Sequence, residues 1–202
     1  MDASTEQGVV IRSENRMNKA NQDQYFSEYI RTRVRTIPDW PIDGVQFRDI
    51  TPLLQNPATF RRLVDCFVHR YYEHDIDVIA CIDARGFIIG GALAYELSTS
   101  LVPIRKRGKL PFDTVSEAYE LEYGTAEVEI HKDAISTGQK ILLLDDLIAT
   151  GGTMLAASNL ITRLGGVIEE AAAIIDLPDL GGSQKLHSNG TKVFSICEFE
   201  GE

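Results

Sequence analysis

The stretch ILLLDDLIATGGT, residues 141–153, decides the fold. Its first four residues form a continuous apolar run, which is typical of a parallel strand buried on both faces. Two acids and a short loop of Thr and Gly follow, and the apolar spacing beyond them predicts a helix over 154–164. Because open α/β sheets bind ligands beyond the carboxyl ends of their strands, the sequence predicts a binding site at this turn.

The loop Ala149-Thr150-Gly151-Gly152-Thr153 has the composition of a phosphate site. Glycines let the backbone approach a phosphate closely, and the first turn of the following helix offers unpaired N–H groups and a partial positive charge. The two threonine hydroxyls add further donors. We therefore predict that this loop binds a monophosphate.

Asp145 and Asp146 stand directly before that loop. Carboxylates repel phosphate, so they predict a part of the ligand that carries hydroxyls or a metal ion, such as a ribose diol with Mg²⁺ nearby. The two halves together predict a ribose 5-phosphate site, and the alternative is a strand end whose acids face solvent. The sequence has neither G-x-x-x-x-G-K-[ST] nor G-x-G-x-x-G after a strand, which argues against a P-loop and a dinucleotide site.

The remaining chain alternates between strand-like and helix-like segments. Apolar runs predict strands at 78–82, 101–104 and 172–175, and an edge strand at 193–196. Helical spacing predicts helices at 23–36, 57–73 and 87–97. Apolar–polar alternation predicts an antiparallel hairpin over 115–131, whereas 43–50 is loop-like. The order of elements predicts an α/β fold with a mostly parallel central sheet flanked by helices.

The composition predicts a single globular domain. The chain has 202 residues, of which 44% are hydrophobic and 25% charged. With 20 Lys and Arg against 30 Asp and Glu, the net charge of −10 disfavours a nucleic-acid partner. Three cysteines without C-x-x-C spacing, and the lack of a membrane-spanning run or signal peptide, favour a cytoplasmic protein without a membrane partner. Residues 1–22 are polar without a period, so we expect a disordered N-terminal extension before a domain at 23–202.

Several stretches of the chain resemble the type I phosphoribosyltransferases, and the set together resembles the adenine branch of that family. They are residues 44–50, 83–87, 104–111, 121–124 and 145–153, and the resemblance extends over about residues 37–200. The last stretch resembles the signature for 5-phosphoribosyl diphosphate (PRPP). The resemblance implies the type I fold, with a small N-terminal hood at about 37–52 and a flexible β-hairpin lid. It also implies a glycosyltransferase of purine salvage, which joins PRPP and adenine to give AMP and pyrophosphate.

Two stretches are candidates for binding the pyrophosphate of PRPP. The segment 83–86 directly follows a predicted strand and precedes a predicted helix, so it offers backbone amides and a guanidinium at one place. The alternative is an ordinary turn with an Arg on the surface. In the family this loop binds pyrophosphate, often with a cis first peptide bond. Four cations stand within residues 105–109, which we interpret as a pyrophosphate clamp rather than a solvated loop. The residues assigned to pyrophosphate are Asp83, Ala84, Arg85, Arg105, Lys106, Lys109 and Tyr123, with Arg85 and Lys109 as catalytic cations.

The resemblance also assigns residues to the base. It places Glu122 on the mobile lid, where it manages the proton on the imidazole ring of adenine; without the resemblance, a surface Glu is the simpler interpretation. Phe47 is expected to stack on the purine, or else to pack against the core. The backbones of Gln46 and Arg48 are expected to read the amino edge of adenine. Ala149 stands where 6-oxopurine relatives usually have an Asp, which favours adenine.

The resemblance further implies Mg²⁺ as a cofactor, held indirectly by Asp145 and Asp146 through PRPP. It implies a homodimer, because part of the 105–109 run reaches the neighbouring subunit's site in the family. Two alternatives stay open, namely transfer to another purine such as xanthine or guanine, and a non-catalytic module that senses PRPP. Some repressors keep this fold for sensing, but the acidic charge and the short segment before residue 37 argue against DNA binding.

Overall fold

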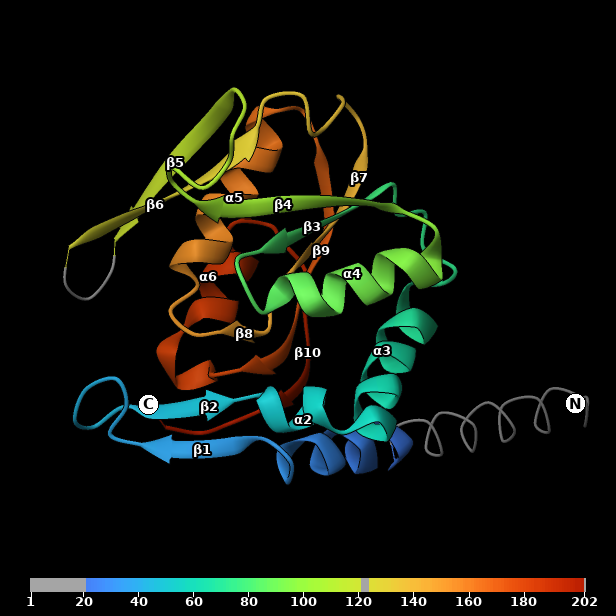
Figure 1. The fold of residues 1–202 in the computed structure, drawn as a ribbon, viewed down its shortest axis with the longest axis vertical. Helices are drawn as coiled ribbons and strands as arrows, with labels where there is room; N and C mark the ends of the chain where they lie inside the picture. Colours follow the sequence, from blue (N-terminus) through green and yellow to red (C-terminus); the bar gives the residue numbers. More distant parts are fainter. Residues whose placement is uncertain (1–20, 121–123, 202) are drawn as a thin grey trace, which may run out of the picture.

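The structure is a computed structural model that describes residues 21–120 and 124–201. A central sheet runs through the molecule (Figure 1). Its strands are β3 (Val78–Ile82), β4 (Ser100–Lys106), β5 (Thr114–Glu120), β6 (Thr125–His131), β7 (Lys140–Leu144), β8 (Leu147–Ile148), β9 (Val167–Asp176) and β10 (Val193–Glu198). The order is β10-β9-β7-β3-β4-β6-β5, and β8 pairs separately with β9. The strands from β10 to β4 are parallel and the β5–β6 hairpin is antiparallel, so the predicted mostly parallel sheet and the edge strand β10 are confirmed.

Helices cover both faces of this sheet, as the α/β prediction requires. They are α3 (Pro57–Tyr71) and α4 (Gly86–Leu97) on one face, and α5 (Gly152–Arg163) and α6 (Gly182–Ser188) on the other (Figure 1). Strand β3 shows why the sheet strands are continuously apolar. Its residues Ile79 and Cys81 enter the core beneath α3 and α4, while Val78 and Ala80 enter the core beneath α5. Each buried strand therefore supplies side chains to two cores at once.

The packing of α4 on β3 depends on a glycine. A Cβ on Gly90 would lie 1.9 Å from the Sγ of Cys81, so only glycine lets the helix lie this close to the strand. Close packing at this point fixes the turn that joins β3 to α4. That turn is one of the segments predicted to bind ligand.

The N-terminal part of the domain differs from the sequence prediction in two places. A helix covers residues 21–31, so the predicted helix 23–36 ends too late. The chain then forms β1 (Arg35–Pro38), which pairs in antiparallel fashion with β2 (Gln46–Asp49), whereas 43–50 was predicted as a loop. β1 is mostly exposed and β2 is half-buried, with Asp49 as its one buried residue, so neither strand shows a period-two pattern of buried apolar residues. A short helix α2 (Thr51–Gln55) leads from the hood into the domain.

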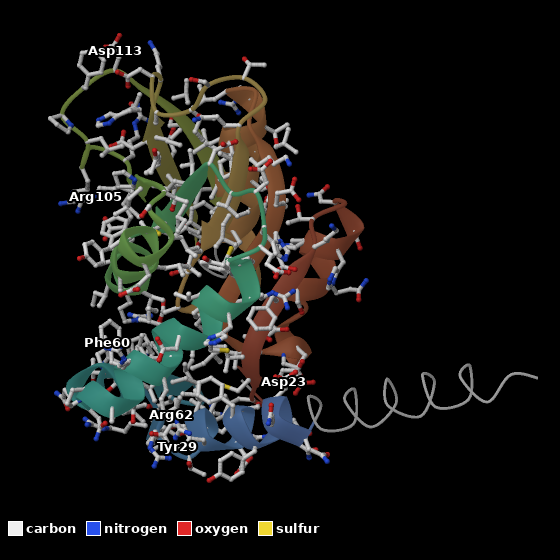
Figure 2. All side chains as sticks on the ribbon, turned by 90° about the vertical axis from the view of Figure 1, so that its right-hand side faces the viewer. Asp23, Tyr29, Phe60, Arg62, Arg105 and Asp113 are labelled. Carbon is white, nitrogen blue, oxygen red and sulfur yellow. The ribbon has the colours of Figure 1, made fainter. Side chains whose placement is uncertain are left out.

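The N-terminal helix packs beside α3, as Figure 2 shows for Tyr29 and Arg62. The hydroxyl groups of Tyr29 and Thr59 are 2.9 Å apart, and the guanidinium of Arg62 lies 4.5 Å from the centre of the Tyr29 ring. Residues 21 and 22 already belong to this helix, although they fall in the segment predicted to be disordered. The rest of that prediction, residues 1–20, lies outside the described residues. Within the described residues, no helix is long and apolar enough to cross a membrane.

Candidate active site

The loop predicted to bind phosphate lies at the carboxyl edge of the sheet. Strand β7 ends at Leu144, the short strand β8 follows the two acids, and α5 begins at Gly152. Gly151 has a φ of +73°, a left-handed conformation that favours glycine, at the N-cap of α5. The predicted arrangement of strand, acids, loop and helix is confirmed, although α5 begins two residues earlier than expected (152 against 154).

The two adjacent acids differ in their surroundings. Asp146 is 4% exposed, and its Oδ2 accepts a hydrogen bond of 2.5 Å from Nε of Arg85. The Oδ1 of Asp145 accepts a bond of 2.8 Å from the backbone N–H of Asp146. Burial and the neighbouring carboxylate raise the pKa of Asp145 well above its ordinary value. A ligand that brings a cation or hydroxyl donors to Asp145 therefore relieves an unfavourable concentration of negative charge.

The turn after β3 brings the second predicted segment beside these acids. The peptide bond between Asp83 and Ala84 is cis, as the family resemblance implies. A Cβ on Gly86 would lie 3.1 Å from the carbonyl oxygen of Leu144, so the turn sits tightly against the end of β7. The side chain of Arg85 extends from this turn to Asp146, to which it donates the hydrogen bond described above. The β3 turn and the β7 acids thus form one continuous surface.

The basic segment after β4 is only partly directed at this surface. The Nε of Arg105 donates to Oδ2 of Asp83 at 2.9 Å, and Figure 2 shows Arg105 on the flank of the molecule. Lys106 borders the pocket. Arg107 instead pairs with Glu127 at 2.6 Å, and Lys109 is exposed and does not line the pocket. The structure therefore brings Arg85 and Lys106 to the pocket and leaves Lys109 outside it.

A pocket of about 250 Å³ lies where these segments meet. Its lining combines predicted and unpredicted residues, namely Ile82, Asp83, Ala84, Arg85, Ile104, Lys106, Tyr119, Val128, Asp145, Asp146, Leu147 and Thr153. Of the predicted phosphate loop, Thr153 lines the pocket, whereas residues 149–152 are not among its lining residues. The pocket therefore contains acids, cations and a helix start within one volume, as a polar ligand with several charges requires.

The hood contributes Phe47, which is half-buried rather than loop-exposed. Its ring packs edge-on against Trp40 at 4.3 Å, and the guanidinium of Arg85 lies 5.6 Å from its centre. The side chain of Arg48 bonds to Thr36 at 2.6 Å and to the carbonyl of Glu200 at 3.3 Å. It ties the hood to the C-terminal segment, which leaves only its backbone for the predicted contact with adenine.

Three functional candidates escaped the sequence analysis. Tyr119 on β5 lines the pocket, and a Cβ on Gly152 would lie 3.2 Å from its ring. Glu129 is 4% exposed and accepts bonds of 2.9 Å from the backbone N–H groups of Lys109 and Leu110. Gly182 lies against the phosphate loop. Each of these residues contacts a segment that is distant in the sequence, so no local motif marks it. The alternating pattern of the hairpin was the one signal that pointed to Tyr119.

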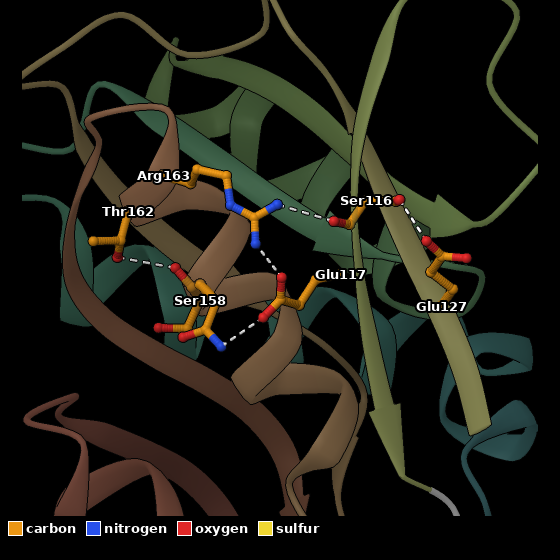
Figure 3. Close-up of polar contacts among 7 residues, drawn as sticks. Ser116, Glu117, Glu127, Ser158, Thr162 and Arg163 are labelled. Atoms are coloured by element: carbon orange, nitrogen blue, oxygen red, sulfur yellow. Dashed lines mark hydrogen bonds and ion pairs between the residues drawn. The ribbon is translucent and has the colours of Figure 1, made fainter. Parts of the chain in front are cut away.

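Ionic contacts join the β5–β6 hairpin to α5, as Figure 3 shows. The guanidinium of Arg163 forms an ion pair with Glu117 and donates to the carbonyl of Ser116 at 3.0 Å. Asn159 adds a bond of 3.1 Å to Glu117, and Ser116 also bonds to Glu127 on β6. The hairpin is therefore bonded to α5, the helix whose first two residues belong to the phosphate loop. The predicted residues Glu122 and Tyr123 lie outside the described residues.

Comparison with known proteins places this site in a family. A family model described as a phosphoribosyl transferase domain matches residues 51–198. The adenine phosphoribosyltransferase of Marinobacter nauticus is 64% identical over 178 residues, covering 88% of this chain and 99% of that protein. The solved adenine phosphoribosyltransferase of Thermoanaerobacter pseudethanolicus has a TM-score of 0.82 and 42% identity, covering 85% of this chain and 99% of the other.

A third relative was solved with ligands. The adenine phosphoribosyltransferase of Trypanosoma brucei, in complex with AMP, pyrophosphate and ribose-5-phosphate, has a TM-score of 0.79 and 28% identity, covering 86% of this chain and 79% of the other. The family model spans well over half of the chain, and the Marinobacter protein covers most of it at high identity. The chain therefore belongs to the adenine branch of the phosphoribosyltransferase family.

Proposed function

We propose that the protein transfers the 5-phosphoribosyl group of PRPP to adenine and releases AMP and pyrophosphate. The observation that carries this proposal is the joining of Asp145 and Asp146, Thr153 of the phosphate loop and the cationic turn after β3 around one pocket. AMP, pyrophosphate and ribose-5-phosphate, the ligands of the Trypanosoma brucei relative, have the chemistry that these segments fit.

The charges around the pocket suggest where each part of PRPP binds. The 5-phosphate binds the backbone N–H groups and hydroxyls of the loop 149–153. The ribose hydroxyls donate to Asp145 and Asp146. The pyrophosphate faces the turn 83–85, with the backbone amides and Arg85 of that turn, and the cations of β4 nearby. Tyr123 and Lys109 join the pyrophosphate end in this proposal, although Lys109 does not line the described pocket.

The residues present fit a Mg²⁺ ion held jointly with PRPP. The described residues contain no group of three or more metal-ligating side chains. Asp145 and Asp146 supply carboxylate oxygens, which are ligands that Mg²⁺ prefers, and both line the pocket. The ion, when bound, neutralises charge on the pyrophosphate. The remaining ligands must come from PRPP and water.

The protein's own residues then stabilise the departure of pyrophosphate. Cleavage of the bond to pyrophosphate leaves positive charge on the ribose and negative charge on the leaving group. Arg85 and Lys106 offer fixed positive charge on the leaving-group side, while the β7 acids face the ribose. Glu122 takes the proton from the imidazole ring of adenine as its nitrogen attacks.

Adenine binds between the hood and the pocket in this proposal. Phe47 offers a ring near Arg85, and the backbones of Gln46 and Arg48 read the amino edge. The side chain of Arg48 is already engaged with Thr36 and Glu200, which fits a role for its backbone alone. Ala149 supplies no carboxylate for a 6-oxopurine.

A purine panel tests the assignment of the base. We expect pyrophosphate release from PRPP with adenine and Mg²⁺, and at least about 100-fold lower kcat/KM with guanine, hypoxanthine or xanthine. A site built for the 6-amino group of adenine rejects purines that carry a 6-oxo group in its place. Turnover with a 6-oxopurine instead would reassign the base. No turnover with any purine would favour a PRPP-sensing module.

A variant of Glu122 tests the acid/base role. Glu122→Ala is expected to lower kcat by about 10²-fold or more, while the affinity for PRPP changes little. Steady-state kinetics and calorimetric titration with PRPP separate the two effects, and Glu120→Ala serves as a neighbouring control. A loss of PRPP affinity with kcat retained would reject the assignment.

We also propose that the protein forms a homodimer through α4. Ile88 and Tyr95 are 47% and 82% exposed on this helix, and Leu101 of the adjoining β4 is 43% exposed. A second copy that covers this face would place its subunit next to the basic segment after β4. Sedimentation is expected to give a dimer for the wild type and a monomer for Tyr95→Glu, because a buried unpaired charge opposes association. A monomeric wild type would contradict the proposal.

A further inference from the structure

A turn crosses directly behind the phosphate loop. It spans residues 177–182, follows β9, and contains the short 3₁₀ helix η1 (Pro178–Leu180) and the first residue of α6. The backbone N–H of Leu177 donates to the carbonyl of Ile148 at 2.9 Å. The strand β8, just before the loop, also pairs with the end of β9. The backbone at the start of the turn is therefore bonded to the segment that leads into the loop.

The closest approach between turn and loop occurs at Gly182. A Cβ on Gly182 would lie 2.2 Å from the carbonyl oxygen of Ala149 and 2.7 Å from the backbone nitrogen of Gly151. In the opposite direction, a Cβ on Gly151 would lie 2.8 Å from both Cα and O of Gly182. The obstructing atoms are backbone atoms, so they cannot rotate away as a flexible side chain does. Any side chain at Gly182 must displace the loop or the turn.

We propose that Gly182 is a positioning residue for the ribose 5-phosphate site. Because it has no side chain, the turn packs against Ala149 and Gly151 and holds their backbone in one conformation. This inference rests on the proposed placement of the 5-phosphate on the loop 149–153. A phosphate bound by backbone N–H groups depends on their positions, and a shift of about 1 Å can cost on the order of 100-fold in rate.

The contact predicts an asymmetric effect on the two ends of PRPP. The atoms nearest to a Cβ on Gly182 belong to Ile148, Ala149 and Gly151, in and just before the loop that follows β7. The proposed pyrophosphate site is built from the turn after β3 and from β4, which is separated from β7 by β3 in the sheet. A change at Gly182 should therefore weaken ligands that carry the 5-phosphate and spare pyrophosphate itself. A general loss of stability would instead weaken the binding of 5-phosphate ligands and of pyrophosphate alike.

The experiment compares Gly182→Ala with the wild type in steady-state competition against PRPP. Ribose 5-phosphate and pyrophosphate serve as separate inhibitors. We expect the inhibition constant for ribose 5-phosphate to rise between about tenfold and about 100-fold, because displaced N–H groups weaken hydrogen bonds to a charged phosphate. The constant for pyrophosphate should stay within about twofold, because the two sites share no moved group. The KM for adenine should stay similarly constant.

Gly181 provides a matched control. It precedes Gly182, has a φ of +73°, and a Cβ built on it meets no atom within 4 Å. Gly181→Asn introduces a larger side chain that tolerates the left-handed conformation, so it should leave both inhibition constants near the wild-type values. If the smaller change Gly182→Ala weakens ribose 5-phosphate binding and the larger change Gly181→Asn does not, the contact of Gly182 with the loop is the cause.

Two outcomes would overturn the proposal. An unchanged inhibition constant for ribose 5-phosphate would show that the loop does not depend on Gly182, and equal weakening of both inhibitors would show a general structural defect. If Gly182→Ala does not fold, Leu177→Ala loosens the same turn through a buried side chain of the core, and its effect should again be confined to ribose 5-phosphate. If ribose 5-phosphate does not compete in the wild type, the phosphate placement fails rather than the role of Gly182.

Discussion

The pocket has two walls that are held in place by different forces. The wall formed by the end of β7 and the phosphate loop is fixed by its backbone. Asp145 N donates to Ala172 O at 3.0 Å, and Asp146 O accepts from the N–H groups of Ile174 and Ile175 at 3.1 Å. Glycine at 182 then allows direct backbone contact with the loop.

The opposite wall, the β5–β6 hairpin, is held by the pairing of β6 with β4, by buried residues such as Val128 and Ile130, and also by charged side chains. The pairs Arg163–Glu117 and Arg107–Glu127 are partly exposed, and Glu129 binds the segment after β4 through its carboxylate. Backbone contacts between buried segments are insensitive to salt and tolerate little change, whereas exposed charge pairs weaken with salt and pH. We call the first wall the fixed wall, or template, and the second, which depends in addition on exposed charges, the adjustable wall.

The largest expected effect is on the fixed wall. The double variant Asp145→Asn with Asp146→Asn removes both carboxylates proposed to bind the ribose. Hydrogen bonds to charged groups contribute about 1.5–3 kcal/mol each, so PRPP affinity should fall by about 100-fold or more. Calorimetric titration with PRPP and Mg²⁺ measures the loss.

The matched control for this variant lies at the opposite edge of the sheet. Asp75→Asn with Asp77→Asn changes two acids that contact Lys140 just before β3, far from the pocket, and should leave PRPP affinity unchanged. Near-normal PRPP binding by the Asp145/Asp146 variant would refute the placement of the ribose, and with it the role of this wall as a template.

A smaller effect is expected at Glu129, which supports the adjustable wall. Burial raises the pKa of Glu129, but the N–H groups of residues 108–110 and the Thr114 hydroxyl outweigh it, so the pKa lies below its ordinary value of 4.5. A lowered folded-state pKa means that the ionised form stabilises the fold above pH 4.5 and that this contribution is lost as the pH falls through the folded-state value.

Glu129→Gln keeps the size of the side chain and removes its charge. We expect unfolding free energy to fall by about 1–2 kcal/mol at neutral pH, and the difference from the wild type to shrink below about pH 4.5. Denaturant titration across this pH range measures both. A difference that does not depend on pH would show that the shape of Glu129, and not its charge, supports the segment after β4.

The same division of forces explains what the sequence could predict. Residues 141–153 carry their information locally, because a doubly buried strand must be apolar and a phosphate turn needs glycine and hydroxyls within a few residues. The hood was harder to predict, since β2 is defined by its pairing with β1 and not by a buried face. Gly182 was invisible because its role arises from contact with Ala149, which is distant in the sequence.

The directions of charged side chains were the hardest feature to predict from the sequence. The run 105–109 was interpreted as one clamp, yet the structure directs its members differently. Arg105 pairs with Asp83, Lys106 borders the pocket, and Arg107 pairs with Glu127. Successive side chains of an extended segment point to opposite faces, so a cluster in sequence is not a cluster in space. The partners that decide each direction lie on other strands.

The smallest expected effect is at Arg163, which anchors the hairpin to α5. Arg163→Met keeps much of the length of the side chain and removes the ion pair with Glu117 and the bond to Ser116. An exposed ion pair contributes about 0.2–1 kcal/mol, so the amides of β5 should exchange with solvent up to about fivefold faster. Hydrogen exchange of residues 114–120 measures this effect.

The control for Arg163→Met is Arg61→Met, which removes another ion pair on the surface. Arg61 lies 3.8 Å from Asp65 on α3, with 83% of its side chain exposed, and does not contact the hairpin. Arg61→Met should leave hydrogen exchange in β5 unchanged. Added salt should raise exchange in wild-type β5 toward the Arg163→Met value and leave the variant nearly unaffected, because screening removes the same attraction as the substitution. If salt accelerates both proteins equally, the hairpin is held by packing against Gly152 and α5, and both walls of the pocket are fixed in the same way.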